Sequence, residues 1–410
     1  MDYPNLKRSA VAGDLPEDPL AEILARVPIR SLCRSKCVAK TWRDLIEDPF
    51  HRKKLPQTLQ GYFLITRDTC GPHIGYASLL ARPARRQIDP SLSFLTKLPG
   101  FESLTFLDSC NGLLIFEHME KSLGYVVCNP TTKQWGAVPR YAPPPCSSSS
   151  LMYDTPMYLV FDLAVSSHFH LVQFVWGWEE LEERFVVDEE LSTSVNVYSS
   201  ESGQWIHIES GWFTHGLQKW HHLGSCCAVL NGMLYFIVYG NYKADQIAAV
   251  DVQEVTRKII PVPIMAGTKR WPKRGCVAQS QGCLHYINKA ADAQLSIWVL
   301  EDYDTQKWVL KHSVSFMELF AKLSHQQSHR GRKKDYSVVA MHPDANVIFI
   351  VQDWNQKLIS YDMDHKLNLD CSFNVQVFNA SNVVFCVKND NYVTNCLAFY
   401  GLVSEKLLID

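Results

Sequence analysis

The chain contains 410 residues, of which 47% are hydrophobic and 20% charged, and its formal net charge is −2. This balance argues against nucleic acid as the main partner, because nucleic-acid-binding domains carry a basic surplus. No stretch is long and apolar enough to predict a membrane span, and the N-terminus lacks the apolar core of a signal peptide. The 13 cysteines are odd in number and scattered through apolar runs, which indicates free thiols and a cytoplasmic or nuclear location.

Residues 14–55 predict a small helical unit that follows a flexible tail at residues 1–13. Asp18 can cap a helix whose first residue is Pro19, where a missing N–H costs nothing. Pro28 ends this helix, a second short helix is expected from Ser31, and a third ends before Pro49. The apolar residues at helical spacing are Leu20, Ile23, Leu24, Val27, Leu32, Val38, Trp42, Leu45 and Ile46.

A unit of about forty residues is too small to bury so many apolar side chains by itself. Four motifs in order resemble the F-box family: Leu-Pro at 15–16, Glu-Ile-Leu at 22–24, Pro-x-x-Ser-Leu at 28–32 and Val-x-Lys-x-Trp-Arg at 38–43. The resemblance implies docking on a Skp-type adaptor, and through it on the cullin of an SCF (Skp–cullin–F-box) ubiquitin ligase. The adaptor-binding residues that it implies are Leu15, Pro16, Leu20, Ile23, Leu24, Leu32, Val38 and Trp42.

Two positions depart from the commonest form of the motif. Pro19 stands where many members have Leu, and Ala39 stands where many plant members have Cys or Ser. Neither change removes an anchor, because Leu20 supplies the apolar group and position 39 stays small. An alternative interpretation is an ordinary helical cap that packs on its own domain without a partner, since apolar stripes are mostly core.

From residue 56 the pattern changes to short apolar runs broken by turn signals, which is typical of many short strands. Asn-Gly pairs at 111–112 and 231–232 predict tight hairpins. Similar units recur at about 50 to 70 residues, close to the period of four-stranded propeller blades. We therefore predict an α+β multidomain chain: a three-helix F-box at 14–55 and an all-β propeller at 56–410, with six blades or alternatively seven.

Two details refine this prediction for residues 56–410. The run at 383–400 is expected to complete the blade that begins near Tyr62. The Asn-Gly-Leu-Leu hairpin at 111–114 and the Asn-Pro-x-Thr-x-x-Trp turn at 129–135 resemble the F-box-associated, kelch-like β-propellers of plant F-box proteins.

The sequence predicts no catalytic residue, cofactor or metal site. His221, His222, Cys226 and Cys227 fit no usual zinc spacing, and the acids at 179–190 form a solvated run, not a desolvated catalytic pair. Segments 143–150, 179–190 and the basic 324–334 are expected to be surface loops. Aromatic residues in loops often carry recognition. The candidates for target binding are Trp176, Trp178, Trp212 and Trp220.

The expected function is that of a non-catalytic substrate-recognition subunit. The F-box would bind the Skp-type adaptor, and the propeller would bind a target protein for ubiquitination and degradation by the proteasome. Two alternatives stay open: an F-box scaffold without ubiquitin transfer, and a kelch-like propeller enzyme or sugar-binding module.

Overall fold

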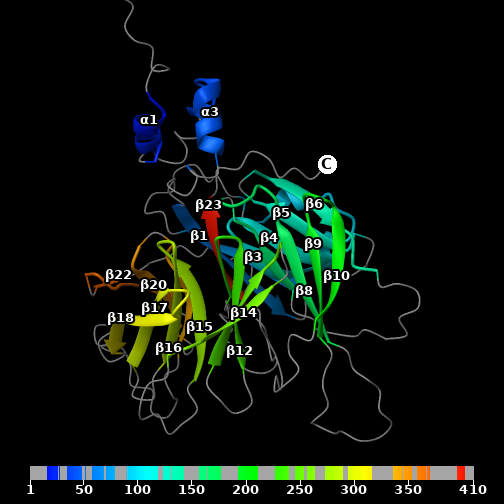
Figure 1. The fold of residues 1–410 in the computed structure, drawn as a ribbon. Helices are drawn as coiled ribbons and strands as arrows, with labels where there is room; N and C mark the ends of the chain where they lie inside the picture. Colours follow the sequence, from blue (N-terminus) through cyan, green and yellow to red (C-terminus); the bar gives the residue numbers. More distant parts are fainter. Residues whose placement is uncertain are drawn as a thin grey trace, which may run out of the picture.

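The chain was analysed as a computed structural model, drawn in Figure 1. It describes residues 16–25, 27, 35–48, 51, 58–68, 71–78, 89, 91–118, 123–130, 132–142, 157–162, 164–176, 193–210, 227–239, 245–253, 256–263, 273–289, 294–315, 336–343, 345–352, 358–365, 367–369 and 395–401.

Two α-helices lie near the N-terminus, α1 (Glu17–Leu24) and α3 (Lys40–Glu47). The prediction that Asp18 caps the first helix is wrong, because α1 begins at Glu17 and Pro16 is its N-cap. Pro19 is tolerated there because the N–H groups of a first turn have no partner within the helix. The third predicted helix ends before Pro49, with Asp48 as its C-cap. The second falls on residues outside the described ranges, so the three-helix F-box stays a prediction.

Five antiparallel sheets of four strands follow, each with its strands side by side in chain order. Blade 1 contains β3 (Leu104–Cys110), β4 (Leu113–His118), β5 (Tyr125–Asn129) and β6 (Gln134–Val138). Blade 2 contains β7 (Met157–Val160), β8 (His170–Trp176), β9 (Thr193–Ser199) and β10 (Gln204–Ser210). Blade 3 contains β11 (Cys227–Leu230), β12 (Met233–Tyr239), β13 (Asp245–Asp251) and β14 (Arg257–Pro261). Blade 4 contains β15 (Lys273–Ser280), β16 (Cys283–Lys289), β17 (Gln294–Asp302) and β18 (Lys307–Ser315). Blade 5 contains β19 (Tyr336–Met341), β20 (Val347–Gln352), β21 (Leu358–Asp362) and β22 (Leu367–Leu369).

A further sheet, the closing sheet, joins the two ends of the propeller. Its order is β2 (Gly71–Ser78), β1 (Thr58–Asp68) and β23 (Asn395–Gly401). Strand β1 pairs with β23, with Ile65 opposite Asn395, and β23 also contacts β3 and β19. The prediction that the C-terminal run joins the blade begun near Tyr62 is therefore confirmed for residues 395–401.

The predicted number of blades is wrong. The described residues form five four-stranded blades and not the six or seven predicted, because the closing sheet has three strands there. The period of a sequence gives the number of repeated units. It does not show how many strands form the unit that is shared between the two ends of the chain.

Tight turns with left-handed backbone connect the first two strands of three blades. Asn111 and Gly112 have φ of 43° and 90°, and Asn231 and Gly232 have φ of 53° and 76°. Gln281 and Gly282 repeat this geometry in blade 4. Two positive φ angles are what a two-residue hairpin requires, which explains the Asn-Gly pairs in the sequence.

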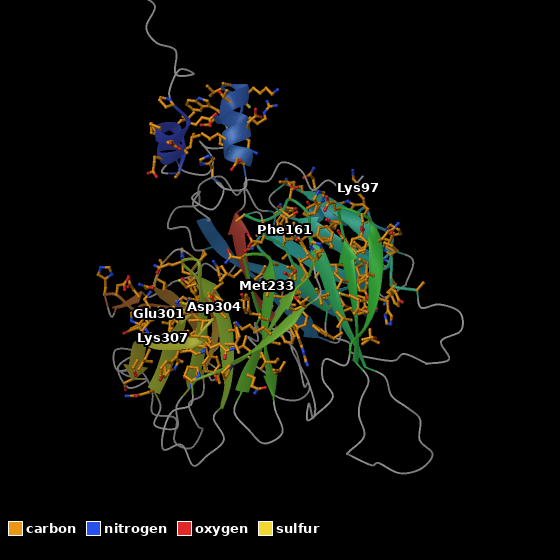
Figure 2. The ribbon with its side chains drawn as sticks, viewed as in Figure 1. Lys97, Phe161, Met233, Glu301, Asp304 and Lys307 are labelled. Atoms are coloured by element: carbon orange, nitrogen blue, oxygen red, sulfur yellow. The ribbon has the colours of Figure 1, made fainter. Side chains whose placement is uncertain are left out.

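The core lies between neighbouring blades. Between blades 2 and 3, Tyr158, Phe174 and Phe236 are at most 2% exposed, and their ring centroids are 5.2 to 5.8 Å apart. Hydrogen bonds add direct links between blades 1 and 2, where Phe161 lies (Figure 2): the Asp108 carboxylate accepts from the Leu159 N–H at 2.8 Å, and the Asn111 amide donates to the Phe161 carbonyl at 2.6 Å. Because each blade buries its faces against its neighbours, the sheets stabilise one another.

Tryptophans at the start of the outermost strands connect blades at their outer side. The Trp205 indole N–H on β10 donates to the Pro139 carbonyl of blade 1 at 2.7 Å. The Trp308 indole N–H on β18 donates to the Pro261 carbonyl of blade 3 at 2.9 Å. A tryptophan at the second position of the outermost strand therefore links blade 2 to blade 1 and, in the same way, blade 4 to blade 3.

Candidate docking site

The two helices form a small apolar cluster of their own. Its buried members are Leu20, Ala21 and Leu24 of α1 and Leu45 and Ile46 of α3, with Val27 and Trp42 at its margin. Every described member of the cluster comes from the helical segment. Helical periodicity brings them together, since they repeat at steps of three and four residues.

The structure divides the predicted adaptor-binding residues into three groups. Leu20 and Leu24 are 4% and 2% exposed and belong to the cluster. Ile23 and Val38 are 50% and 59% exposed, and Pro16 is also exposed. Trp42 is half-buried, and its indole nitrogen has no hydrogen-bond partner among the described residues. Leu15 and Leu32 lie outside the described residues.

α1 carries acidic residues at its start, whereas α3 carries two basic residues in its first turn followed by Asp44 and Glu47. Glu17 and Asp18 lie in the first turn of α1, where negative charge is favoured by the positive end of the helix dipole. Lys40 and Arg43 are exposed on α3. The exposed apolar positions are therefore flanked by an acidic helix start and a basic first turn.

A second surface lies at the outer side of blades 1 and 2. Tyr141 stacks on His207 with ring centroids 5.5 Å apart and an interplanar angle of 16°, and it meets Trp205 edge-on at 6.3 Å. Arg140 lies over the Tyr125 ring at 5.4 Å and pairs with Glu117 at 2.7 Å. This arrangement exposes aromatic rings whose positions are fixed by their neighbours.

The four tryptophans predicted to bind a target are only partly placed. Trp176 ends β8, opposite Thr193 of β9, which in turn is opposite Ser210 at the end of β10. The ends of β8 and β10 therefore lie at the same end of blade 2. Trp178, Trp212 and Trp220 fall outside the described residues, as does the side chain of Trp176.

Several ionisable groups are buried inside the propeller, and burial shifts their pKa values. Burial raises the pKa of Asp108 to about 7, against the lowering effect of the two backbone N–H groups that it accepts from. Burial also raises the pKa of the Cys110 and Cys128 thiols and lowers the pKa of His285 to about 4. The cause is the cost of charge in an apolar surrounding.

The described ranges contain no group of three or more His, Cys, Asp or Glu side chains that could hold a metal ion. The predicted loops and His221, His222 and Cys226 lie outside those ranges, and Cys227 is half-buried at the start of β11. No helix in the described part of the chain is long and apolar enough to cross a bilayer.

Sequence reasoning did not single out Tyr141, His207 or the edge strand β10. A signal was available: residues 204–210 contain no Pro, Lys or Arg, unlike the corresponding strands β6 with its following Pro139, β14 and β18. The absence of protective residues is informative only for a strand that lies at the edge of a sheet. The strand order must therefore be known first.

Comparison with known proteins places the chain in a family. The family described as "F-box protein At3g26010-like, beta-propeller" matches residues 86–395, and the F-box domain matches residues 13–54. F-box protein At5g49610 of Arabidopsis thaliana is 27% identical over 308 residues, which cover 73% of this chain and 79% of that protein. Putative F-box/kelch-repeat protein At4g22430 of Arabidopsis thaliana is 25% identical over 362 residues, covering 85% and 78%.

Among solved structures, a nidogen/laminin complex aligns with 76% of this chain and 92% of its own, at 9% identity and a TM-score of 0.37. A likeness at that level carries no argument. The propeller match covers most of the chain and agrees with the repeated four-stranded sheets, and the F-box match agrees with the motifs at 15–43. The chain therefore belongs to the F-box proteins that carry an At3g26010-like β-propeller.

Proposed function

We propose that this chain is the substrate-recognition subunit of an SCF-type ubiquitin ligase. The F-box docks on a Skp-type adaptor, which links it to a cullin, and the propeller holds a target protein. The observation that carries the proposal is the exposure of Ile23 on α1 and of Val38 just before α3, neither of which belongs to the buried cluster of the two helices.

Ile23 and Val38 are largely exposed, so they contribute little to the stability of the chain and are available to a partner. Complete burial of an aliphatic side chain contributes about 1.5–3 kcal/mol, so covering the exposed halves of Ile23 and Val38 contributes about 2 kcal/mol in total. Leu20 and Leu24 act differently, because they hold α1 against α3. We therefore assign adaptor contact to the exposed Ile23, Val38 and Pro16, and the packing of the two helices to the cluster.

The mechanism is positional. Ubiquitin transfer requires a lysine of the target to stay near the ubiquitin-loaded enzyme, and a subunit that holds both raises their effective concentration. The chain needs no nucleophile for this role. It binds the adaptor with the helical unit and the target with the propeller, and each unit has its own apolar core.

The adaptor contact is tested by co-purification with a Skp-type adaptor. The double variant Ile23→Asp/Val38→Asp should lose the adaptor, because it places two charges in an apolar interface. Leu310→Asp is the matched control, since Leu310 is 41% exposed on β18 of blade 4. Leu24→Asp is less informative, because it would disrupt the helix pair itself. Equal adaptor yield from the double variant and the control would contradict the proposal.

Ubiquitin transfer is tested on the captured targets. Proteins that bind the propeller should be retained by the Ile23→Asp/Val38→Asp variant and should accumulate in its presence, as they do when the proteasome is inhibited with the wild-type chain. Targets that bind but keep the same abundance in both cases would instead indicate a scaffold without transfer.

A further inference from the structure

Strand β10 is the outer edge of blade 2. Among the strands that the structure describes, it pairs only with β9, in a regular register from Gln204 opposite Ser199 to Ser210 opposite Thr193, without a bulge. The other side of an edge strand presents a row of unpaired N–H and C=O groups, which are a template for one more strand. Figure 1 shows β10 at the outside of the molecule.

The outermost strands of the other sheets are protected. Strands β6 and β14 have five residues, β22 has three, and β18 is interrupted by two register shifts. Proline and basic residues, which also prevent edge pairing, occur in or directly after several of them: Pro72 in β2, Pro139 and Arg140 after β6, Arg257, Lys258 and Pro261 in β14, and Lys307 and Lys311 in β18. Lys307 is labelled in Figure 2. Strand β10 has seven residues and none of these features.

The side chains of β10 offer two different surfaces to an added strand. Ile206 is 56% exposed, although Ile is normally covered in a folded protein. Trp205 and His207 point to the opposite side of the strand, because side chains alternate along it, and there they meet Tyr141 of blade 1. An incoming strand would therefore place alternate residues beside Ile206 and beside the Tyr141–His207 stack.

His207 is held in one orientation by a buried polar chain. Its Nδ1 lies 2.7 Å from the amide oxygen of Asn196, a residue only 2% exposed, and the amide nitrogen of Asn196 donates to Gln173 at 3.2 Å. Because that donation leaves the Asn196 oxygen as an acceptor, Nδ1 of His207 carries the proton. The exposed imidazole, when neutral, therefore offers Nε2 as a hydrogen-bond acceptor.

We propose that the propeller takes its target by pairing an extended segment of the target protein with the outer edge of β10. The inference rests on the proposed function, because it names the surface and the chemical character of the target. The segment has strand-like alternation, with an apolar residue beside Ile206 and a hydrogen-bond donor beside His207. Backbone pairing supplies affinity, and the two alternating contacts supply selectivity.

The test uses the full chain bound to its Skp-type adaptor and a fluorescent peptide with the sequence of β9, Thr193 to Ser199. This peptide has the required alternation, since β9 already places Val197 opposite Ile206 and Asn196 opposite His207. We expect saturable binding in fluorescence anisotropy and slower hydrogen exchange of the amides of residues 204–210. A peptide with Val197→Pro, which cannot complete the pairing, should not bind.

The decisive variant is Ile206→Lys, which gives β10 the protection that β14 and β18 already have. It should weaken peptide binding by about tenfold or more, because an exposed lysine opposes edge pairing. Leu310→Lys is the matched control, on an edge strand that already carries two lysines, and should change binding less than about twofold. Neither position is buried, so both variants should fold.

Three results would overturn the proposal: no saturable binding, equal loss in Ile206→Lys and Leu310→Lys, or protection confined to residues other than 204–210. Self-association of the chain that Ile206→Lys abolishes would also overturn it, by assigning the edge to a second copy. Co-purification with the adaptor is measured on the same samples. Its failure would contradict the proposed function, whereas loss of peptide binding with the adaptor retained concerns β10 alone.

Discussion

The helix pair and the propeller treat apolar surface in opposite ways. In the propeller, clusters between blades contain side chains with no exposure at all, such as Phe174 and Phe236. In the helical segment, the described cluster is small, and Ile23 and Val38 are about half-exposed. Nine or more buried residues in each cluster between blades can seal a sheet, whereas two short helices cannot seal themselves. Under the proposed function, the propeller is stable by itself, whereas the adaptor covers the exposed side chains of the helix pair.

The largest expected effect compares one sealed and one open position. Phe236→Ala should lower the free energy of unfolding by about 3–5 kcal/mol, because it leaves a cavity between blades 2 and 3. Ile23→Ala should lower it by less than about 1 kcal/mol, since half of that side chain is already in water. Thermal and urea unfolding followed by near-UV circular dichroism measure both. Similar losses from the two variants would remove the contrast.

A titration sharpens the comparison from inside the propeller. Unfolded Asp108 releases its proton near pH 3.8, and the folded group near pH 7, because burial raises its pKa. Between these values the folded chain binds more protons, so stability should fall as the pH rises, by at most about 1.4 kcal/mol per pH unit from this one group. Asp108→Asn should flatten that slope. Identical slopes for wild type and variant between pH 4 and 7 would contradict the assignment.

Two glycines test how tightly the blades are packed. Gly124 has φ of +74°, and a Cβ there would lie 2.4 Å from the Val138 carbonyl oxygen, so Gly124→Ala should cost about 3 kcal/mol. Gly203 has φ of +67° with nothing within 4 Å, and Gly203→Ala should cost about 1 kcal/mol from backbone strain alone. Unfolding in urea compares them. Equal costs would show that the close approach at Gly124 is relieved without penalty.

The smallest expected effect concerns the outer connection between blades. Trp205→Phe removes the indole N–H that donates to the Pro139 carbonyl and should cost about 1 kcal/mol. Trp135, at the equivalent place in β6, is 40% exposed, and Trp135→Phe should change the free energy of unfolding by less than about 0.5 kcal/mol. The melting temperatures of the two variants give the comparison. A larger loss of stability from Trp135→Phe than from Trp205→Phe would contradict the assignment of the link between blades to Trp205.

The sequence was most informative where structure is local. The F-box motifs and the Asn-Gly turns are set by neighbouring residues, so the motifs led to the family and the turns to the hairpins. The start of α1 was misplaced, because a proline is accepted anywhere in a first turn and does not mark its first residue. The exposure of Ile23 against the burial of Leu24 also could not be predicted, since periodicity gives a stripe but not the width of the part that α3 covers.

Non-local features were beyond the sequence for a different reason. The three-stranded closing sheet depends on pairing between residues more than 300 positions apart, and no local signal states how many strands each end supplies. The sequence analysis did not single out Asp108, which is buried against blade 2. The open edge of β10 follows only from the order of strands within blade 2.

The pairing of β1 with β23 has a consequence for biosynthesis. A ribosome delivers the N-terminal helices and β1 early, but the strand that β1 needs on its inner side arrives only with residues 395–401. Until then blades 1 and 5 have no common neighbour, and the growing polypeptide must be kept from misassembling, since contacts so distant along a chain form slowly. A frameshift or early stop near the C-terminal region would thus yield a product with intact helices and an open ring, which under the proposed function would still bind the adaptor but would not hold a target.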